Sequence, residues 1–248
     1  MYDPPGYLWA LTIAGIVAIP AATCIVLYGG ALRAGQSRAR AALLGGGAAV
    51  VFGGWFTASA VIAGHGWYHT RLGHGVPWMP VAVFGFLGLL LALLRIPVVA
   101  RALTAPATVN RLEIPHTFRV AGVAFLITMA LGHLPALFAL PAGLGDMATG
   151  FAALVIGRRL AHGTGRRAAL WLNAFGLTDL VVALTLGALT AYQLINVTPT
   201  GSAISALPLA LVPTAEVPLL LALHITSLAT LRRAPRTALQ PAAPLAVG

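Results

Sequence analysis

Three of the five acidic residues in this 248-residue chain lie within long apolar stretches: Asp146, Asp179 and Glu216. A carboxylate at the centre of a membrane helix costs roughly 2.5–3.5 kcal/mol to insert, so these groups have to face protein or water rather than lipid. We find no arginine within an apolar stretch, and His133 and His224 are the basic side chains expected at membrane depth. The carboxyls are therefore expected to stay protonated, share a proton, pair with a histidine, or hold a cation or small ligand.

The two aspartates follow the same local pattern. In PAGLGDMATG (141–150) and FGLTDLVVA (175–183), a glycine precedes the aspartate by three residues and a small residue follows it by four. This spacing places the acid and its small neighbours on one helix face, where another backbone can approach closely. Consecutive membrane helices run in opposite directions, so a true repeat would be an inverted pair of the kind that surrounds transporter binding sites. The pattern predicts either a helix contact or a ligand site.

The third acid, Glu216, lies in the proline-rich segment SALPLALVPTAEVPLLLALHITS. Pro208, Pro213 and Pro218 recur every five residues there. Proline removes a backbone hydrogen bond, and the freed carbonyl needs another partner in lipid, so such helices line protein or a cavity. Glu216 beside free carbonyls predicts a proton or cation site. The alternative is a kinked helix with a protonated, hydrogen-bonded glutamic acid.

Histidines form a second cluster in the sequence AGHGWYHTRLGHGVPW: His65, His69 and His74. His65 and His69 are four residues apart, a spacing that suits a metal ion if both lie on one helix. Gly64 and Gly66 instead predict that the helix ends there. The two interpretations are an ordinary polar loop at the membrane surface, and a metal or haem site completed by a residue such as His133 or Asp146.

The composition identifies the elements that hold these residues. Hydrophobic residues make up 59% of the chain and charged residues only 8%, with a mean hydropathy of +0.90, whereas soluble domains carry about 25% charged residues. Apolar runs near the ~20 residues that a membrane helix needs predict an all-α polytopic membrane protein. We expect a single domain over 1–233, built as a bundle of seven transmembrane helices at about 8–32, 41–63, 80–100, 118–138, 141–157, 168–191 and 205–230. Only a turn around Pro135 to Pro141 separates the fourth and fifth helices, so a re-entrant hairpin is the alternative there. The Pro/Ala-rich segment 234–248 is predicted to be a disordered cytoplasmic tail.

The arginines predict the orientation of the bundle. Fourteen of the 15, Arg119 included, fall on one side of the seven predicted spans and only Arg71 lies opposite. Loops rich in arginine stay in the cytoplasm, so the N-terminus is expected outside and the C-terminus inside. His116 and His162 lie among the cytoplasmic arginines and are expected to be solvated. The formal net charge of +10 thus reflects membrane orientation rather than nucleic-acid binding, and the Ala/Gly/Leu/Arg-rich composition favours a bacterial inner membrane.

Two familiar functions are disfavoured by the residues themselves. The chain contains no lysine, so it cannot form a retinal Schiff base. Gly143-Leu144-Gly145-Asp146 resembles the Gly-x-Gly-Asp string of presenilin-type intramembrane aspartyl proteases. That family places the partner aspartate in the preceding helix and a Pro-Ala-Leu element downstream, whereas here Asp179 follows and Pro135-Ala136-Leu137 lies upstream. We therefore transfer no catalytic role from the resemblance.

Two function classes remain. The first is a transporter or receptor-like protein that binds a proton, cation or small ligand at Asp146, Asp179, Glu216, His133 and His224. The alternative is a membrane-embedded enzyme for a lipophilic substrate, with a metal on the outer histidines or with the carboxyls as acid and base. No cofactor signature is recognised. The lipid bilayer is the expected partner, and the glycines at 45–47 and 53–54 predict a close contact with a neighbouring helix or with a second copy in a homo-oligomer.

Overall fold

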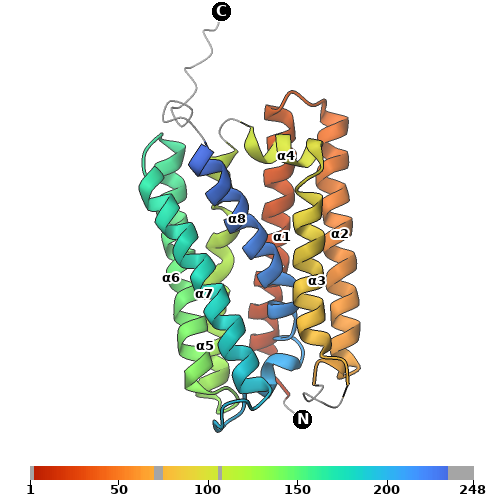
Figure 1. The fold of residues 1–248 in the computed structure, drawn as a ribbon, viewed down its shortest axis with the longest axis vertical. Helices are drawn as coiled ribbons and strands as arrows, with labels where there is room; N and C mark the ends of the chain where they lie inside the picture. Colours follow the sequence, from red (N-terminus) through yellow and green to blue (C-terminus); the bar gives the residue numbers. More distant parts are fainter. Residues whose placement is uncertain (1–2, 70–74, 106–107, 234–248) are drawn as a thin grey trace, which may run out of the picture.

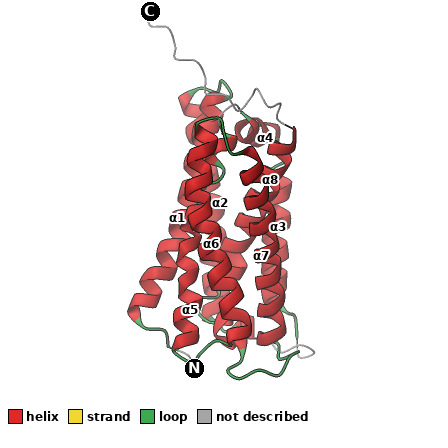
Figure 2. Ribbon diagram, turned by 90° about the vertical axis from the view of Figure 1, so that its left-hand side faces the viewer, coloured by secondary structure: helices red, strands yellow, loops and turns green. Residues whose placement is uncertain are grey.

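The computed structural model describes residues 3–69, 75–105 and 108–233, and every regular element within them is helical, as the sequence predicted. Together these elements form an elongated bundle (Figure 1, Figure 2). The α-helices are α1 (Gly6–Arg33), α2 (Arg38–Gly64), α3 (Trp78–Leu93), α4 (Pro97–Thr104), α5 (Val123–Ala130), α6 (Ala136–Ala161), α7 (Arg166–Ala191) and α8 (Val217–Arg233). The shorter elements are the 3-10 helices η1 (Trp67–His69), η2 (Val109–Arg111), η3 (Pro115–Gly122) and η4 (Gly201–Ser205), and the π-helical turn η5 (Val212–Glu216). The predicted disordered tail, 234–248, lies outside the described residues.

Several of these helices have the length and composition of membrane spans. Within the described residues, five are long and apolar enough to cross a membrane: Gly6–Arg33, Arg38–Gly64, Ala136–Ala161, Arg166–Ala191 and Val212–Arg233. The pair α3 and α4 passes the same test as one unit, although it is bent by 84°. The chain thus has the helices of a multi-pass membrane protein, with five or six candidate spans where the sequence predicted seven.

The predicted third helix, 80–100, is divided. α3 ends at Leu93, and Pro97 begins α4 after an extended Ile96 (φ −66°, ψ 125°), which is the conformation that a following proline favours. Proline at the first position of a helix starts a new helix more readily than it continues an old one. α4 then crosses the end of α1, where Gly30 leaves room for the backbone carbonyl of Ala102.

The boundary between the predicted fourth and fifth helices lies earlier than expected. α5 ends in a Schellman motif in which Gly132 (φ 78°) donates to Met129 O at 2.9 Å and His133 donates to Thr128 O at 3.0 Å. Pro135 then precedes the first residue of α6, and Pro141 is accommodated inside that helix. α6 is therefore a continuous helix of 26 residues, and the re-entrant alternative for 141–157 is wrong.

The proline-rich seventh segment is broken, as predicted, but not throughout. Pro218 has no N–H to donate to Thr214 O, four residues earlier. The indole N–H of Trp55 on α2 donates to that carbonyl instead, at 2.9 Å. The Thr214 hydroxyl donates to Ala210 O at 2.6 Å and lies 2.6 Å from Ser59 Oγ. The freed backbone group thus faces protein, in agreement with the rule for membrane interiors.

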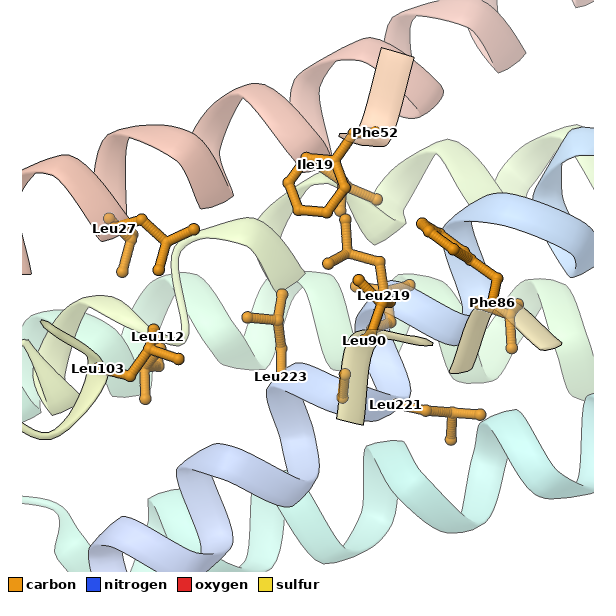
Figure 3. Packing of buried hydrophobic residues seen from close by; sticks show 14 of the residues in the cluster. Ile19, Leu27, Phe52, Phe86, Leu90, Leu103, Leu112, Leu219, Leu221 and Leu223 are labelled. Carbon is orange, nitrogen blue, oxygen red and sulfur yellow. The ribbon is translucent and has the colours of Figure 1, made fainter. Parts of the chain in front are cut away.

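The span Val212–Arg233, formed by η5 and α8, is the most buried of the candidate spans. α8 runs diagonally between α7 and α3 (Figure 1). The largest apolar cluster packs around it: Leu219, Leu221 and Leu223 of α8 meet Ile19 and Leu27 of α1, Phe52 of α2, and Phe86 and Leu90 of α3 (Figure 3). A second cluster, which includes Phe125 and Phe138, joins α5 and α6 to η4. The polar side chains described next lie on the elements that these clusters hold together.

Candidate functional site

Arg119 of η3 is the centre of a buried polar cluster. Its side chain is fully buried, and it forms ion pairs with Asp146 of α6 and Asp179 of α7, whose side chains are 13% and 8% exposed. Nε donates to Asp146 Oδ1 at 2.8 Å and Nη2 lies 2.7 Å from the same oxygen, while Nη2 also donates to Asp179 Oδ2. This corrects the expectation that Arg119 belongs to the cytoplasmic arginines and that the intramembrane carboxyls have no arginine partner.

The 3-10 geometry of η3 explains why an arginine reaches this position. A 3-10 helix has three residues per turn, so residues three apart lie on the same face. Glu113, His116 and Arg119 follow that step, and all three are buried. Gly122 is the next residue on that face, and a Cβ there would lie 2.6 Å from Asp146 Oδ2. η3 thus presents a polar face to the interior of the bundle. If the same residues were assumed to be α-helical, this polar face would not be predicted.

His224 of α8 extends the cluster, and its tautomer follows from its partners. Arginine nitrogens only donate, so His224 Nε2 accepts from Arg119 Nη1 at 3.1 Å. Nδ1 therefore carries the proton and donates to Asn173 Oδ1 at 2.8 Å. With this assignment, His224 is neutral and connects Arg119 to Asn173 of α7 through hydrogen bonds.

The cluster continues to a buried carboxyl near the other end of η3. Asn173 Nδ2 donates to Glu113 Oε1 at 2.7 Å, and Ser227 Oγ donates to the same oxygen at 2.8 Å. Burial raises the pKa of Glu113 to about 7, against the opposing effect of these two hydrogen bonds. The ring of His116 stacks on His224 with centroids 3.8 Å apart. His116 is fully buried, so the expectation that it is solvated is wrong.

Glu216, the third predicted acid, lies beside the Arg119 cluster rather than on the guanidinium. It is 6% exposed and lines a small cavity with Asp146, Thr12 and Gly122. The cavity has a volume of about 10 Å³, close to the minimum for one water molecule. A site of this size suits a proton, or a single water molecule that carries it, and is too small for an organic ligand.

The glycines of the two Gly-x-x-Asp segments bring the backbones close to the cluster. A Cβ at Gly176 would lie 2.5 Å from His224 Nε2 and 3.0 Å from Arg119 Nη1, and one at Gly145 would overlap the carboxylate of Asp179. A Cβ at Gly150 would lie 2.9 Å from Val120 N. These glycines are therefore points of close helix contact, and the contacts bring both aspartates to the same guanidinium.

The protease-like arrangement is absent from this site. In aspartyl proteases two carboxyls share one proton directly, whereas Asp146 and Asp179 both bind Arg119.

The remaining predicted site residues lie elsewhere. His133 is exposed after α5 and lines a separate cavity with His69 and Thr200, so it does not join His224 at the carboxyls. His65 is exposed as well, and its ring lies 5.8 Å from that of Trp67. His74 falls outside the described residues. Among residues that the structure does describe, no three His, Cys, Asp or Glu side chains are placed to hold a metal.

Sequence reasoning missed five members of the cluster: Glu113, His116, Arg119, Asn173 and Ser227. The three-residue step in LEIPHTFRVAG was an available signal for the first three, since Pro115 lies between them and favours a short, tightly wound start. Asn173 carries no such signal, because a lone asparagine in an apolar helix has many structural roles.

Comparison with known proteins adds a family but no activity. A family profile described as a domain of unknown function (DUF8737) matches residues 76–232, more than half of the chain. The matched region contains Arg119 and every side chain that it contacts in the cluster, and it leaves out α1 and α2. No curated protein and no solved structure matches the chain.

Proposed function

We propose that this chain, which belongs to the family described as a domain of unknown function (DUF8737), is a proton-coupled membrane transporter whose protons bind at the carboxyls around Arg119. The supporting observation is that the buried carboxyls outnumber the buried guanidinium group. One buried guanidinium faces two carboxyls, and a third, Glu216, lies across a water-sized cavity. Acidic residues within membrane-spanning helices are typical of proton relays and ion pathways.

The charge balance supports proton binding in particular. Beside a single guanidinium, three ionised carboxyls would leave two uncompensated negative charges in a medium of low dielectric constant. Such charges are strongly disfavoured, and carboxyls that share a site retain protons. We infer that one or two of Asp146, Asp179 and Glu216 carry a proton at rest. These are the protons that a change in the bundle would release.

The element that carries Glu216 is suited to such a change. Glu216 ends the π-helical turn η5, in which Val217 N donates to Val212 O, one residue beyond the α-helical partner. π-helical turns are rare and occur frequently at functional sites. Pro213 and Pro218 keep the surrounding backbone from forming a continuous α-helix. A rearrangement of η5 would move Glu216 relative to Asp146.

We propose the predicted topology of seven crossings, with the N-terminus outside and the C-terminus in the cytoplasm of a bacterial inner membrane. η3 and α5 follow each other directly and together extend roughly 28 Å at the standard rises, close to the ~30 Å of a bilayer core. They would supply the crossing that length and hydropathy alone do not identify. α1 begins and α8 ends at opposite ends of the bundle (Figure 1), which supports an odd number of crossings.

Infrared spectroscopy of the reconstituted protein tests proton binding directly, because a protonated carboxyl has its own C=O stretch. We expect a carboxyl band that changes with pH and weakens in Asp146→Asn and in Glu216→Gln. Asp3→Asn is the matched control, since Asp3 is exposed at the start of the chain. Spectra of the two site variants that equal the wild-type spectrum at every pH would overturn the proposal.

Transport is tested separately in proteoliposomes that contain a pH-sensitive dye. Addition of a transported compound should change the internal pH with wild-type protein and with Asp3→Asn. The change should disappear with Glu216→Gln, because that substitution keeps the shape of the side chain and removes its titratable proton.

A further inference from the structure

A second, larger cavity lies next to the carboxyls. It has a volume of about 290 Å³ and is lined by α3, α7, η4 and η5 and by single residues of α5 and α8 and two of α6. Its walls are apolar, with Met79 and Val83 from α3, Leu180 and Leu184 from α7, and Phe138 from α6. This volume is near the lower end of the about 300–1,000 Å³ typical of small-molecule sites, so a compound with one ring and a short chain fits.

One wall residue of the larger cavity is a carboxylate. Asp146 lines this cavity as well as the small one beside Glu216, and Phe125 and Val212 also border both. The other polar groups are the hydroxyls of Ser205, Tyr192 and Thr185, of which Thr185 already donates to Val181 O at 2.8 Å. The cavity therefore has an apolar body and a single acidic contact point, directly adjacent to the proposed proton site.

The cavity reaches the surface of the bundle between α3 and α7. Phe84 on α3 lines it and is 66% exposed, and Thr185 on α7 lines it and is exposed too. Both positions lie on the predicted membrane-spanning part of their helices. A ligand that enters between these helices would come from the hydrocarbon region of the bilayer, which selects for lipophilic compounds.

We propose that this cavity binds a lipophilic amine, with its hydrocarbon or aromatic part against α3 and α7 and its protonated nitrogen on Asp146. The positive charge proposed for the ligand follows from the charges in the Arg119 cluster. Arg119 directs its donors to Asp146, Asp179 and His224, while the carboxyls outnumber it. A cation is therefore attracted and an anion repelled. The inference rests on the proposed function, because the amine and the proton would neutralise the same carboxyls in turn.

Binding of 4-phenylbutylamine and of its uncharged analogue 4-phenylbutan-1-ol to protein in lipid nanodiscs tests the inference, with empty nanodiscs as the measure of partition into lipid. We expect saturable binding of the amine, about tenfold tighter than that of the alcohol. Asp146→Asn should abolish this preference, and Ala183→Phe, which fills the cavity without changing a charge, should weaken binding of both compounds. Asp3→Asn should bind both as the wild type does.

Each contrary result has a distinct meaning. Equal affinity for the amine and the alcohol would overturn the cationic ligand, and binding no greater than that of empty nanodiscs would overturn the cavity as a ligand site. Undiminished binding in Ala183→Phe would likewise place the ligand elsewhere. Infrared spectra recorded on the same samples separate this inference from proton binding: a pH-dependent carboxyl band without amine binding overturns the ligand alone, and amine binding without that band overturns the proton site.

Discussion

Arg119 shows how strongly one side chain determines the properties of this interior. Its guanidinium satisfies oxygens of two aspartates and one nitrogen of His224, and its side chain is fully buried. A buried ion pair stabilises a protein less than its geometry suggests, because desolvation opposes the attraction. Its loss is costly nevertheless, since the partners then stay buried without a counter-charge.

We expect Arg119→Met to lower the free energy of unfolding by roughly 3–5 kcal/mol, the range for breaking a buried pair. Thermal unfolding in detergent measures the effect. The triple variant that adds Asp146→Asn and Asp179→Asn should recover much of the loss, because no buried charge is then left alone. An unchanged melting temperature in Arg119→Met would contradict the assigned role.

Glu113 predicts a pH dependence of stability. Its pKa in the folded protein is about 7, above the ordinary value of 4.5. The protonated form is therefore favoured by folding, so the stabilisation is complete below pH 4.5 and is lost as the pH rises through about 7. Relative to Glu113→Gln, which keeps the oxygen that accepts from Asn173 and Ser227, the melting temperature of the wild type should fall between about pH 5 and about pH 8. Parallel curves for the two proteins would show that Glu113 does not titrate in this range.

The elements differ in how far the sequence specifies them. α1, α2 and α7 lie within a few residues of their predicted bounds, because long apolar runs end there at polar or glycine residues. Helix boundaries near prolines are harder to predict from the sequence. Pro97 divides the third helix, while Pro141 lies within α6 without ending it, and the two positions look alike in a hydropathy profile.

α8 yields a prediction about backbone hydrogen bonds. Trp55→Phe removes the indole N–H that donates to Thr214 O in place of the backbone N–H that Pro218 lacks. We expect the free energy of unfolding to fall by about 1–3 kcal/mol, because the carbonyl is then buried and unpaired. Pro218→Ala restores a backbone N–H, so the double variant should lose less than the sum of the two single variants. Trp171→Phe is the matched control, since Trp171 is 76% exposed. Additive losses in thermal unfolding would contradict the compensation.

At the scale of the whole molecule, the fold places the proposed proton site and the apolar cavity side by side, with Asp146 in both. The connections of α1 to α2 and of α6 to α7 lie at one end of the bundle, and η4 lies at the other (Figure 1). The proposed orientation puts the two connections in the cytoplasm and η4 outside. The two ends can therefore be distinguished by chemical labelling of exposed residues.

Single cysteines test this orientation, in a Cys24→Ala background that removes the chain's one cysteine. Ser202→Cys in η4 should react with a membrane-impermeant maleimide in intact cells. Ser37→Cys and Thr164→Cys, at exposed positions in the two connections, should react only after the membrane is permeabilised. Reaction of all three from outside, or the reverse pattern, would exclude seven crossings with the N-terminus outside.

The sequence alone determined that the chain is helical, with apolar segments typical of a multi-pass membrane protein, and that Asp146, Asp179 and Glu216 lie within those segments, because hydropathy depends on local composition. Only the tertiary structure decided which groups meet them. Arg119 finds its partners 27, 60 and 105 residues away in the chain, and it reaches them because η3 winds with three residues per turn and glycines let the helices approach. The three-residue step around Pro115 indicates the helix type, but the distant contacts cannot be deduced from the residues around position 119.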